Sequence, residues 1–187
     1  MTEYWGPNLW HLMHTVSYNT NANFSNVERQ MLSYFYRNIG NMIPCIFCKT
    51  NYKQHLFEYP IDNYLENKST LSDWVVKIHN IVNKSTNKKI YDNNEAYELH
   101  KIISGKKIIN ILNFLSKVAF MDNRPKVLNH LLNFFRNLQY VFPTQNGRDL
   151  LIFFFKKYPI TVQYKNVNYF RTWYYNLERL MIQSFNL

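Results

Sequence analysis

Two cysteines separated by two residues are the clearest candidates for chemistry in this sequence. Cys45 and Cys48 follow Pro44, where the apolar spacing predicts the start of a helix. A spacing of three residues places both sulfurs on nearly the same helix face, close enough to form a disulfide. A helix N-terminus stabilises a thiolate, so Cys45, the nearer to the helix end, should exchange with substrate. These are the properties of a redox dithiol.

The spacing of the two cysteines leaves two other interpretations open, half of a zinc site or a pair of inert core thiols. Zinc would need further ligands, for which His11 and His14 are candidates. A thioredoxin-like fold would place the motif after a strand, and this sequence shows no such pattern. A dithiol on a helical bundle needs another electron acceptor, and a flavin is the obvious one.

The elements that must position these residues are predicted to be helices. Apolar residues recur at helical spacing in five stretches, separated by Gly, Pro, Ser or Asn: 8–18, 27–39, 45–57, 72–83 and 93–103. The first helix is expected to begin after a Gly6-Pro7 stop, and Ser69 or Ser72 is expected to cap the fourth. No clean alternating strand or Asn-Gly hairpin is present. The sequence therefore predicts an all-α bundle.

The second half of the chain repeats the plan of the first. At a shift of 99 residues, Trp74 meets Trp173, and the pattern of residues 32–39 meets that of 131–138 without a gap. Convergence of two Asn-rich helical stretches is the alternative to a duplication. Other residues stand where the second copy would need its cysteines, so only the first copy keeps the reactive groups. We therefore predict an active domain over residues 1–103 and a degenerate helical domain over 104–187.

Charge and hydropathy exclude several classes of protein. The chain has 22 Lys and Arg against 12 Asp and Glu, a net charge of +10, which first suggests nucleic acid or an anionic cofactor. No nucleic-acid-binding signature supports the first reading, so we predict a basic solvated surface and no nucleic-acid partner. The longest apolar run, 150–155, is too short for a membrane helix, and no signal sequence opens the chain. An intracellular protein without a membrane span is expected.

Three segments together resemble the Erv/ALR family of FAD-dependent sulfhydryl oxidases. Residues 6–15 look like the family's G-x-x-x-W-x-x-L-H-T opening, and residues 44–48 hold the C-x-x-C pair. Residues 74–84 look like the family's W-x-x-x-x-H-N-x-V-N segment. The match covers about residues 5–101 in the family's order and spacing. The three-part match is far more specific than any one segment.

The resemblance implies an all-α fold, in which an FAD-binding bundle of four to five helices precedes the degenerate Erv-like helical domain. Cys45 and Cys48 would be catalytic, with Cys48 next to the flavin and Cys45 exchanging with substrate. His79 and Asn83 share one helix face, which agrees with lining one ligand. The residues implied to bind FAD are Gly6, Trp10, His14, Tyr18, Cys48, His79, Asn80, Asn83, Lys84, Lys88, Tyr91 and Tyr97. His100 fits the register of Tyr97 nearly as well, and no metal ligand is implied.

The family's activity implies a reaction and a set of partners. Thiol-containing protein substrates, or a thioredoxin-like relay protein, would reduce the cysteine pair. Electrons would pass through FAD to molecular oxygen and yield hydrogen peroxide. A homodimer is implied by the resemblance alone. Many relatives carry a second, mobile cysteine pair, which this chain lacks, so substrates are expected to reach Cys45 directly.

The chain departs from the family pattern at three positions. Val76 and Asn93 stand where many relatives have a structural disulfide beside the flavin, and Pro7 stands where a basic residue is common. The structural disulfide is therefore absent, and the flavin-phosphate contact that the basic residue would make is not expected from Pro7.

The degenerate second half resembles the arrangement in sulfhydryl oxidases of baculoviruses and related large insect DNA viruses. An AT-rich genome, indicated by the abundant Asn, Lys, Ile, Tyr and Phe, is compatible with such a virus. That resemblance implies a role in viral disulfide formation and virion assembly, in the host cytoplasm or nucleus and in the virion. The alternative is a non-catalytic helical virion scaffold or nucleic-acid-binding protein with vestigial cysteines.

Overall fold

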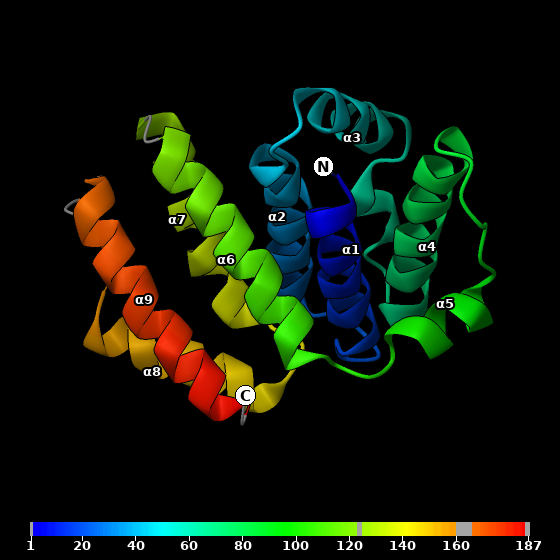
Figure 1. Cartoon of the computed structure of the whole chain (residues 1–187). Coiled ribbons are helices and arrows are strands. Elements are labelled where there is room, and N and C mark those ends of the chain that lie inside the picture. Colours follow the sequence, from blue (N-terminus) through cyan, green and yellow to red (C-terminus); the bar gives the residue numbers. More distant parts are fainter. Residues whose placement is uncertain (1, 123–124, 160–165, 186–187) are drawn as a thin grey trace.

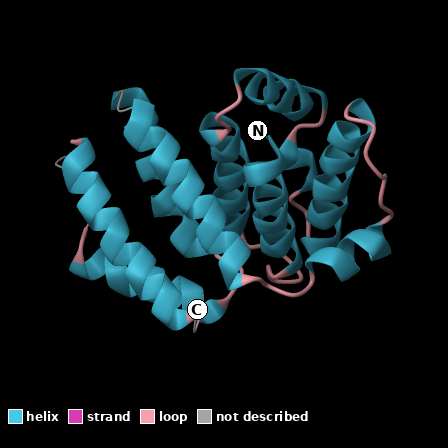
Figure 2. Ribbon diagram, viewed as in Figure 1, coloured by secondary structure: helices cyan, strands magenta, loops and turns pink. Residues whose placement is uncertain are grey.

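The computed structural model describes residues 2–122, 125–159 and 166–185, and over these residues the chain forms helices and no strand (Figures 1 and 2). The elements, in chain order, are α1 (Thr2–Tyr18), α2 (Asn26–Met42), α3 (Ile46–Glu58), the 3-10 turn η1 (Ile61–Tyr64), α4 (Lys68–Ser85), α5 (Asn93–His100), α6 (Gly105–Asp122), α7 (Pro125–Val141), α8 (Gln145–Lys157) and α9 (Val167–Ser184). The predicted all-α class is confirmed. Within the described ranges, none of the helices has the length and apolar character needed to cross a membrane.

The first five helices form the part of the bundle that carries the candidate site. In Figure 1, α3 lies across one end of this group, and α5 lies at the opposite end. Helix α1 packs against α4 and α5, while α3 packs against α2. Helices α4 and α5 therefore face α1 directly, while α3 lies against α2.

The starts of α2 and α4 are fixed by reciprocal capping bonds. At α2, Ser25 and Glu28 form a capping box, and at α4 Asn67 and Thr70 form another. The Thr70 N–H donates to Asn67 Oδ1 at 3.1 Å, and Thr70 Oγ1 accepts from the Asn67 N–H at 3.2 Å. The expectation that Ser69 or Ser72 caps this helix is therefore wrong, because Asn67 satisfies the free amides first.

Helix α1 runs through Gly6 and Pro7, so the expected stop at this dipeptide is also wrong. The residues before it are held by tertiary contacts. The Trp5 ring is buried and stacks on Phe114 of α6, with ring centroids 6.3 Å apart. Burial of a large aromatic side chain offsets the hydrogen bond that a proline removes from a helix.

The helices of the two halves correspond in length and in register. Helices α2 and α7, α3 and α8, and α4 and α9 have equal lengths, and each pair starts 99 residues apart. The Trp74 indole N–H donates to the Tyr59 carbonyl at 2.9 Å, and Trp173 donates to the Tyr158 carbonyl at 2.9 Å. The same internal bond therefore closes the third and fourth helices of each half. The division into two domains at residue 103 stays a prediction.

The two halves share one buried core. Phe35 and Phe134, which are 99 residues apart in the sequence, are both fully buried and contact each other with centroids 6.0 Å apart. The Asn137 side-chain amide donates to the Met31 carbonyl at 3.0 Å. In Figure 1, α6 and α7 lie beside α1 and α2, and these helices pack against each other in pairs. The second half therefore covers a face of the first.

Candidate active site

The cysteine pair lies at the start of α3 as a disulfide. The two Cα atoms are 5.2 Å apart. Cys45 is the N-cap residue, and its Sγ accepts from the Cys48 N–H at 3.2 Å. Both cysteines are half-buried against the core, while Ile46 and Phe47 between them are exposed. The two sulfurs therefore form the bridge that the spacing predicts. The disulfide lies at the surface of the molecule, where a substrate can reach it.

Helix α3 is held in place through two buried tyrosines. The Tyr52 hydroxyl donates to the Tyr36 carbonyl at 2.9 Å, and the Tyr36 hydroxyl donates to the Met13 carbonyl at 2.9 Å. A Cβ at Gly40 would come within 2.9 Å of the Tyr52 ring, so the close approach of α2 and α3 requires glycine there. This chain of contacts links the helix that carries the disulfide to the part of α1 that carries His14.

A cluster of aromatic and imidazole rings fills the space between α1, α4 and α5. The Trp10 ring stacks on His79, with centroids 4.2 Å apart and planes 10° apart. His14 Nε2 lies 3.0 Å from His79 Nδ1, and the His14 ring stacks on His100 at 4.3 Å. Tyr18 contacts the His14 ring at 5.7 Å and also Tyr97. We call Trp10, His14, Tyr18, His79, Tyr97 and His100 the ring cluster.

Burial keeps the histidines of this region neutral at pH 7. Desolvation lowers the pKa of His79 to about 4, helped by the charge of Lys88, and it lowers the pKa of His14 well below its usual value. The pKa of His100 falls to about 3, because of its burial and the neighbouring His11, His79 and Lys107. Neutral imidazoles can each donate one hydrogen bond and accept another. The ring cluster therefore presents uncharged, flat and polar-edged groups.

Two buried polar atoms of the ring cluster have no hydrogen-bond partner within the described part of the chain. They are Nδ1 of the fully buried His14 and the hydroxyl oxygen of Tyr18. Burial also raises the pKa of Tyr18 to about 12, so this hydroxyl keeps its proton. Unpaired buried polar atoms are costly, and they are commonly satisfied by a ligand or by ordered water. A planar cofactor with acceptors and donors on its edge, such as a flavin, fits this requirement.

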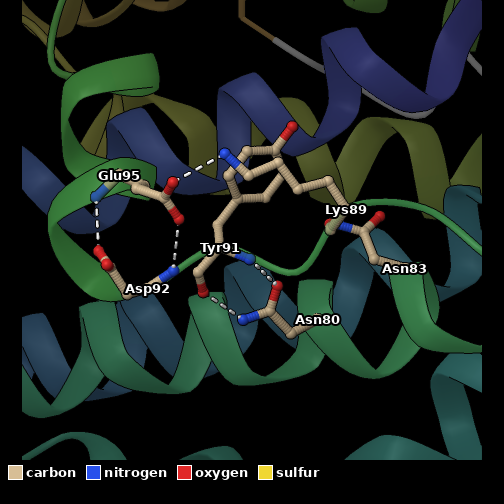
Figure 3. A network of polar contacts seen from close by, with 6 residues as sticks. All are labelled: Asn80, Asn83, Lys89, Tyr91, Asp92 and Glu95. Carbon is tan, nitrogen blue, oxygen red and sulfur yellow. Dashed lines mark hydrogen bonds and ion pairs between the residues drawn. The ribbon is translucent and has the colours of Figure 1, made fainter.

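The two asparagines of the third motif hold the segment that connects α4 to α5 (Figure 3). Asn80 Nδ2 donates to the Tyr91 carbonyl at 2.6 Å, and Asn80 Oδ1 accepts from the Tyr91 N–H at 3.1 Å. Asn83 Nδ2 donates to the Lys89 carbonyl at 2.9 Å. Both amides therefore fix the backbone at Lys89 and Tyr91, and their predicted contact with a flavin stays a prediction.

The remaining predicted residues lie on α4, on the segment that follows it and on α1. Lys84 and Lys88 are exposed, and Tyr91 is half-buried with Lys89 Nζ 5.0 Å from its ring centroid. The positive charges of Lys84 and Lys88 suit an anionic group at the end of α4. Gly6 lies one turn before Trp10 on α1, where a Cβ would meet nothing within 4 Å. The structure thus brings most of the predicted residues to three neighbouring helices, with Gly6 at the margin.

Two histidines lie outside the set of residues predicted to bind FAD: His100, a member of the ring cluster, and His11, which adjoins it. His100, noted in the sequence only as an alternative to Tyr97, stacks on His14, and His11, noted only as a candidate zinc ligand, contacts His100. The spacing of His11 and His14 does not predict the contact between His11 and His100, because His100 lies on a helix nearly 90 residues later. Ring nitrogens of His14, His79 and His100 lie within 4.8 Å of one another, a geometry that can also hold a metal ion.

The corresponding space in the second half is closed by hydrogen bonds. Glu178, which aligns with His79, accepts from the Asn113 amide, and the Tyr174 hydroxyl donates to Asn113 Oδ1. Burial raises the pKa of Tyr174, so it remains a neutral donor. These contacts join α6 to α9 where His14 and His79 join α1 to α4. At this position the second half has a hydrogen-bonded pair, the Glu178 carboxylate and the Asn113 amide, where the first half has two imidazoles.

Comparison with known proteins agrees with the site. The chain is 33% identical over 107 residues to a probable FAD-linked sulfhydryl oxidase of Acanthamoeba polyphaga mimivirus, covering 56% of this chain and 75% of the relative. It is 26% identical over 111 residues to an FAD-linked sulfhydryl oxidase of African swine fever virus, covering 59% and 88%. The crystal structure of a mutant of Erv1 from Saccharomyces cerevisiae shares the fold, with a TM-score of 0.51 at 23% identity over 54% of this chain and 84% of that one.

The family comparison covers the segments that build the site. The Erv1/Alr family matches residues 7–102, which hold the disulfide, both buried tyrosines and the whole ring cluster. The match ends just after α5 and thus leaves out the second half. This chain belongs to the Erv1/Alr family.

Proposed function

We propose that this protein is an FAD-dependent thiol oxidase that forms disulfides in protein substrates through Cys45 and Cys48. The observation that carries the proposal is the disulfide at the accessible start of α3, linked through Tyr52 and Tyr36 to the helix that carries His14. Both viral relatives named above are FAD-linked sulfhydryl oxidases, and membership of the family supports the same cofactor here.

The first chemical step takes place at the accessible disulfide. A substrate thiolate attacks Cys45 Sγ, which forms a mixed disulfide, breaks the Cys45–Cys48 bond and releases Cys48 as a thiolate. A second substrate thiolate then attacks the substrate sulfur of that bond. The substrate leaves as a disulfide, oxidised by two electrons, and both cysteines are left reduced.

Reoxidation of the cysteine pair needs a two-electron acceptor. FAD supplies this chemistry when bound, with molecular oxygen as the final oxidant and hydrogen peroxide as the product. In the protein, the stacked Trp10 and His79 and the neutral His14 would hold the flavin ring, and Tyr18 would close its edge. Lys84 and Lys88 would bind its phosphates. The α4–α5 segment that Asn80 and Asn83 fix would hold the remainder.

The cysteine count and the viral relatives support a more specific proposal about the substrates and the place of the reaction. Only Cys45 and Cys48 are available, so a substrate protein or a thioredoxin-like relay has to meet Cys45 directly. The viral relatives support a role in disulfide formation during virion assembly, in the host cytoplasm or nucleus, where thiols are otherwise kept reduced. A homodimer belongs to the same proposal, and analytical ultracentrifugation tests it.

The deciding experiment uses the purified chain of 187 residues. We expect a yellow protein with a flavin absorption band that consumes oxygen and releases hydrogen peroxide when given a dithiol. Cys48→Ser should keep the flavin band and lose oxygen consumption, and Cys45→Ser should lose activity with thiol substrates. A colourless protein that cannot be reconstituted with FAD would contradict the proposal and favour a non-catalytic scaffold.

A second experiment identifies the substrate. In the Cys48→Ser variant, the Cys45 thiolate can attack a disulfide of an oxidised substrate, which breaks that disulfide, forms a mixed disulfide with Cys45 and releases the other substrate sulfur as a thiolate. No Cys48 thiol is left to displace the substrate from Cys45, so alkylation of the released thiol should keep substrates attached. Mass spectrometry of the trapped species would then identify them. Failure to capture any thiol through Cys45, with Cys45→Ser as the control, would count against direct access.

A further inference from the structure

A pair of histidines outside the predicted set meets at the edge of the ring cluster. Nδ1 of His11 on α1 lies 3.3 Å from Nδ1 of His100 on α5. The backbone N–H of Ser104, just before α6, donates to His11 Nε2 at 3.1 Å. His11 is fully buried, and His100 is half-buried with its ring flat against His14.

These contacts determine which nitrogen of each ring carries the proton. A backbone N–H can only donate, so Nε2 of His11 accepts from Ser104 and has no proton of its own. Burial and the nearby Lys107 lower the pKa of His11 to about 4, so the neutral ring carries its single proton on Nδ1. That proton is donated to Nδ1 of His100. His100 is also neutral at pH 7, and its proton is therefore on Nε2.

The Nε2–H group of His100 can donate a hydrogen bond, and none of the described residues accepts it, because the hydrogen-bond contact of His100 is through Nδ1. His100 lies within the ring cluster, since the centroids of the His100 and His14 rings are 4.3 Å apart and the two ring planes differ by only 8°. Ring nitrogens of His14, His79 and His100 also approach within 4.8 Å of one another. The edge of a flavin ring offers carbonyl oxygens and ring nitrogens that need donors of this kind.

We propose that His100 binds the flavin through its Nε2–H, and that His11 is a positioning residue that fixes His100 in this tautomer. The proposal rests on the function proposed above. Its acceptor is an oxygen or nitrogen on the edge of the isoalloxazine ring. Since reduction increases the electron density on that edge, a fixed neutral donor there stabilises the reduced flavin.

Two substitutions of His11 separate positioning from simple structural support. The side-chain amide of asparagine reaches the position of Nδ1, so His11→Asn keeps a donor to His100 and loses the acceptor for Ser104. Glutamine reaches the position of Nε2, so His11→Gln keeps the contact with Ser104 and loses the donor. We expect FAD to bind at least tenfold more weakly to His11→Gln than to His11→Asn. If His11 only supports the backbone at Ser104, the order is reversed, and the proposal is overturned.

His100 itself is tested by His100→Phe, which keeps a flat ring and removes the donor. We expect the dissociation constant of FAD to rise at least tenfold and the flavin reduction potential to become more negative. His130→Phe, on α7 outside the ring cluster, is the control and should leave both values unchanged. Wild-type affinity and potential in His100→Phe would overturn the proposal.

Proton positions can be read directly by ¹⁵N NMR of the histidine rings in the full chain as purified. We expect His11 as the Nδ1–H tautomer and His100 as the Nε2–H tautomer. The opposite assignment at either ring would overturn the inference. If the protein proves unable to bind FAD, the proposed oxidase function fails, while the NMR result still decides whether His11 fixes His100.

Discussion

The Trp10 ring lies flat on the His79 ring, with centroids 4.2 Å and planes 10° apart, and this contact joins α1 to α4 at the proposed flavin site. The two residues come from two different motifs of the sequence, about 70 positions apart. Their stacking places the face of an aromatic ring against the face of a neutral imidazole, and flat rings of this kind are surfaces on which a planar cofactor can pack.

Replacing His79 tests that contact. His79→Ala removes the stacking partner of Trp10 and the hydrogen-bond partner of His14, so we expect FAD affinity to fall at least tenfold, about 1.4 kcal/mol. Fluorescence titration with FAD measures it. His130→Ala removes a histidine from α7 and serves as the control. Equal affinity in the two variants would show that His79 does not bind the cofactor.

Replacing Gly40 tests how α3 is positioned. A Cβ there would meet the Tyr52 ring at 2.9 Å, so Gly40→Ala should displace α3 and lower the free energy of unfolding by about 1–3 kcal/mol. Because α3 carries the disulfide, oxidation of a dithiol should slow as well. Gly6→Ala is the stability control, since its Cβ meets nothing within 4 Å and alanine favours a helix. Urea unfolding and oxygen consumption would measure the two effects, and an unaltered unfolding midpoint in Gly40→Ala would contradict the argument.

Replacing Trp173 separates structure from chemistry in the second half. Trp173→Phe leaves the Tyr158 carbonyl without the indole donor, so the free energy of unfolding should fall by about 1–3 kcal/mol. We expect FAD affinity and turnover to stay at their wild-type values at a temperature where the protein is folded. Trp74→Phe is the matched variant in the first half, and it removes the same bond to Tyr59. A loss of FAD from Trp173→Phe in the folded protein would show that the second half contributes to the site.

Stability should fall as the pH is lowered from 7 towards 4. His11 and His79 have pKa values of about 4 in the folded protein, because of burial and the charges of Lys107 and Lys88. An unfolded histidine binds its proton near pH 6.5, so in this window the unfolded state binds more protons than the folded state. Each unit by which a pKa is lowered corresponds to about 1.4 kcal/mol, fully present above pH 6.5 and lost as the pH falls.

Urea midpoints at pH 7.5, 6 and 5 measure this dependence. His100→Phe removes one histidine whose pKa is lowered to about 3, so the midpoint should vary less with pH in this variant. A midpoint that is constant between pH 7.5 and 5 would mean that the histidines are not buried as the structure shows.

The sequence by itself determined the helical class and the position of the disulfide, and the resemblance to the family named five of the six residues of the ring cluster. Cys45 and Cys48 follow a helix start directly, so local spacing is enough to bring their sulfurs together. The 99-residue shift found in the sequence reappears as equal helix lengths and as matching bonds from Trp74 and Trp173. Periodicity and spacing depend on residues that are close in the sequence, so the helices and the disulfide that they predict do not depend on how distant segments pack.

Only the tertiary structure decided where α1 starts, which backbone groups Asn80 binds and which residues His11 contacts. Helix α1 passes Pro7 because Trp5 is buried against Phe114 of a helix about 110 residues later. Asn80 clamps Tyr91, and His11 meets His100 and Ser104, through contacts that span between 11 and 93 positions. Such contacts depend on how distant helices pack, and helical spacing reports only which face of each helix is apolar.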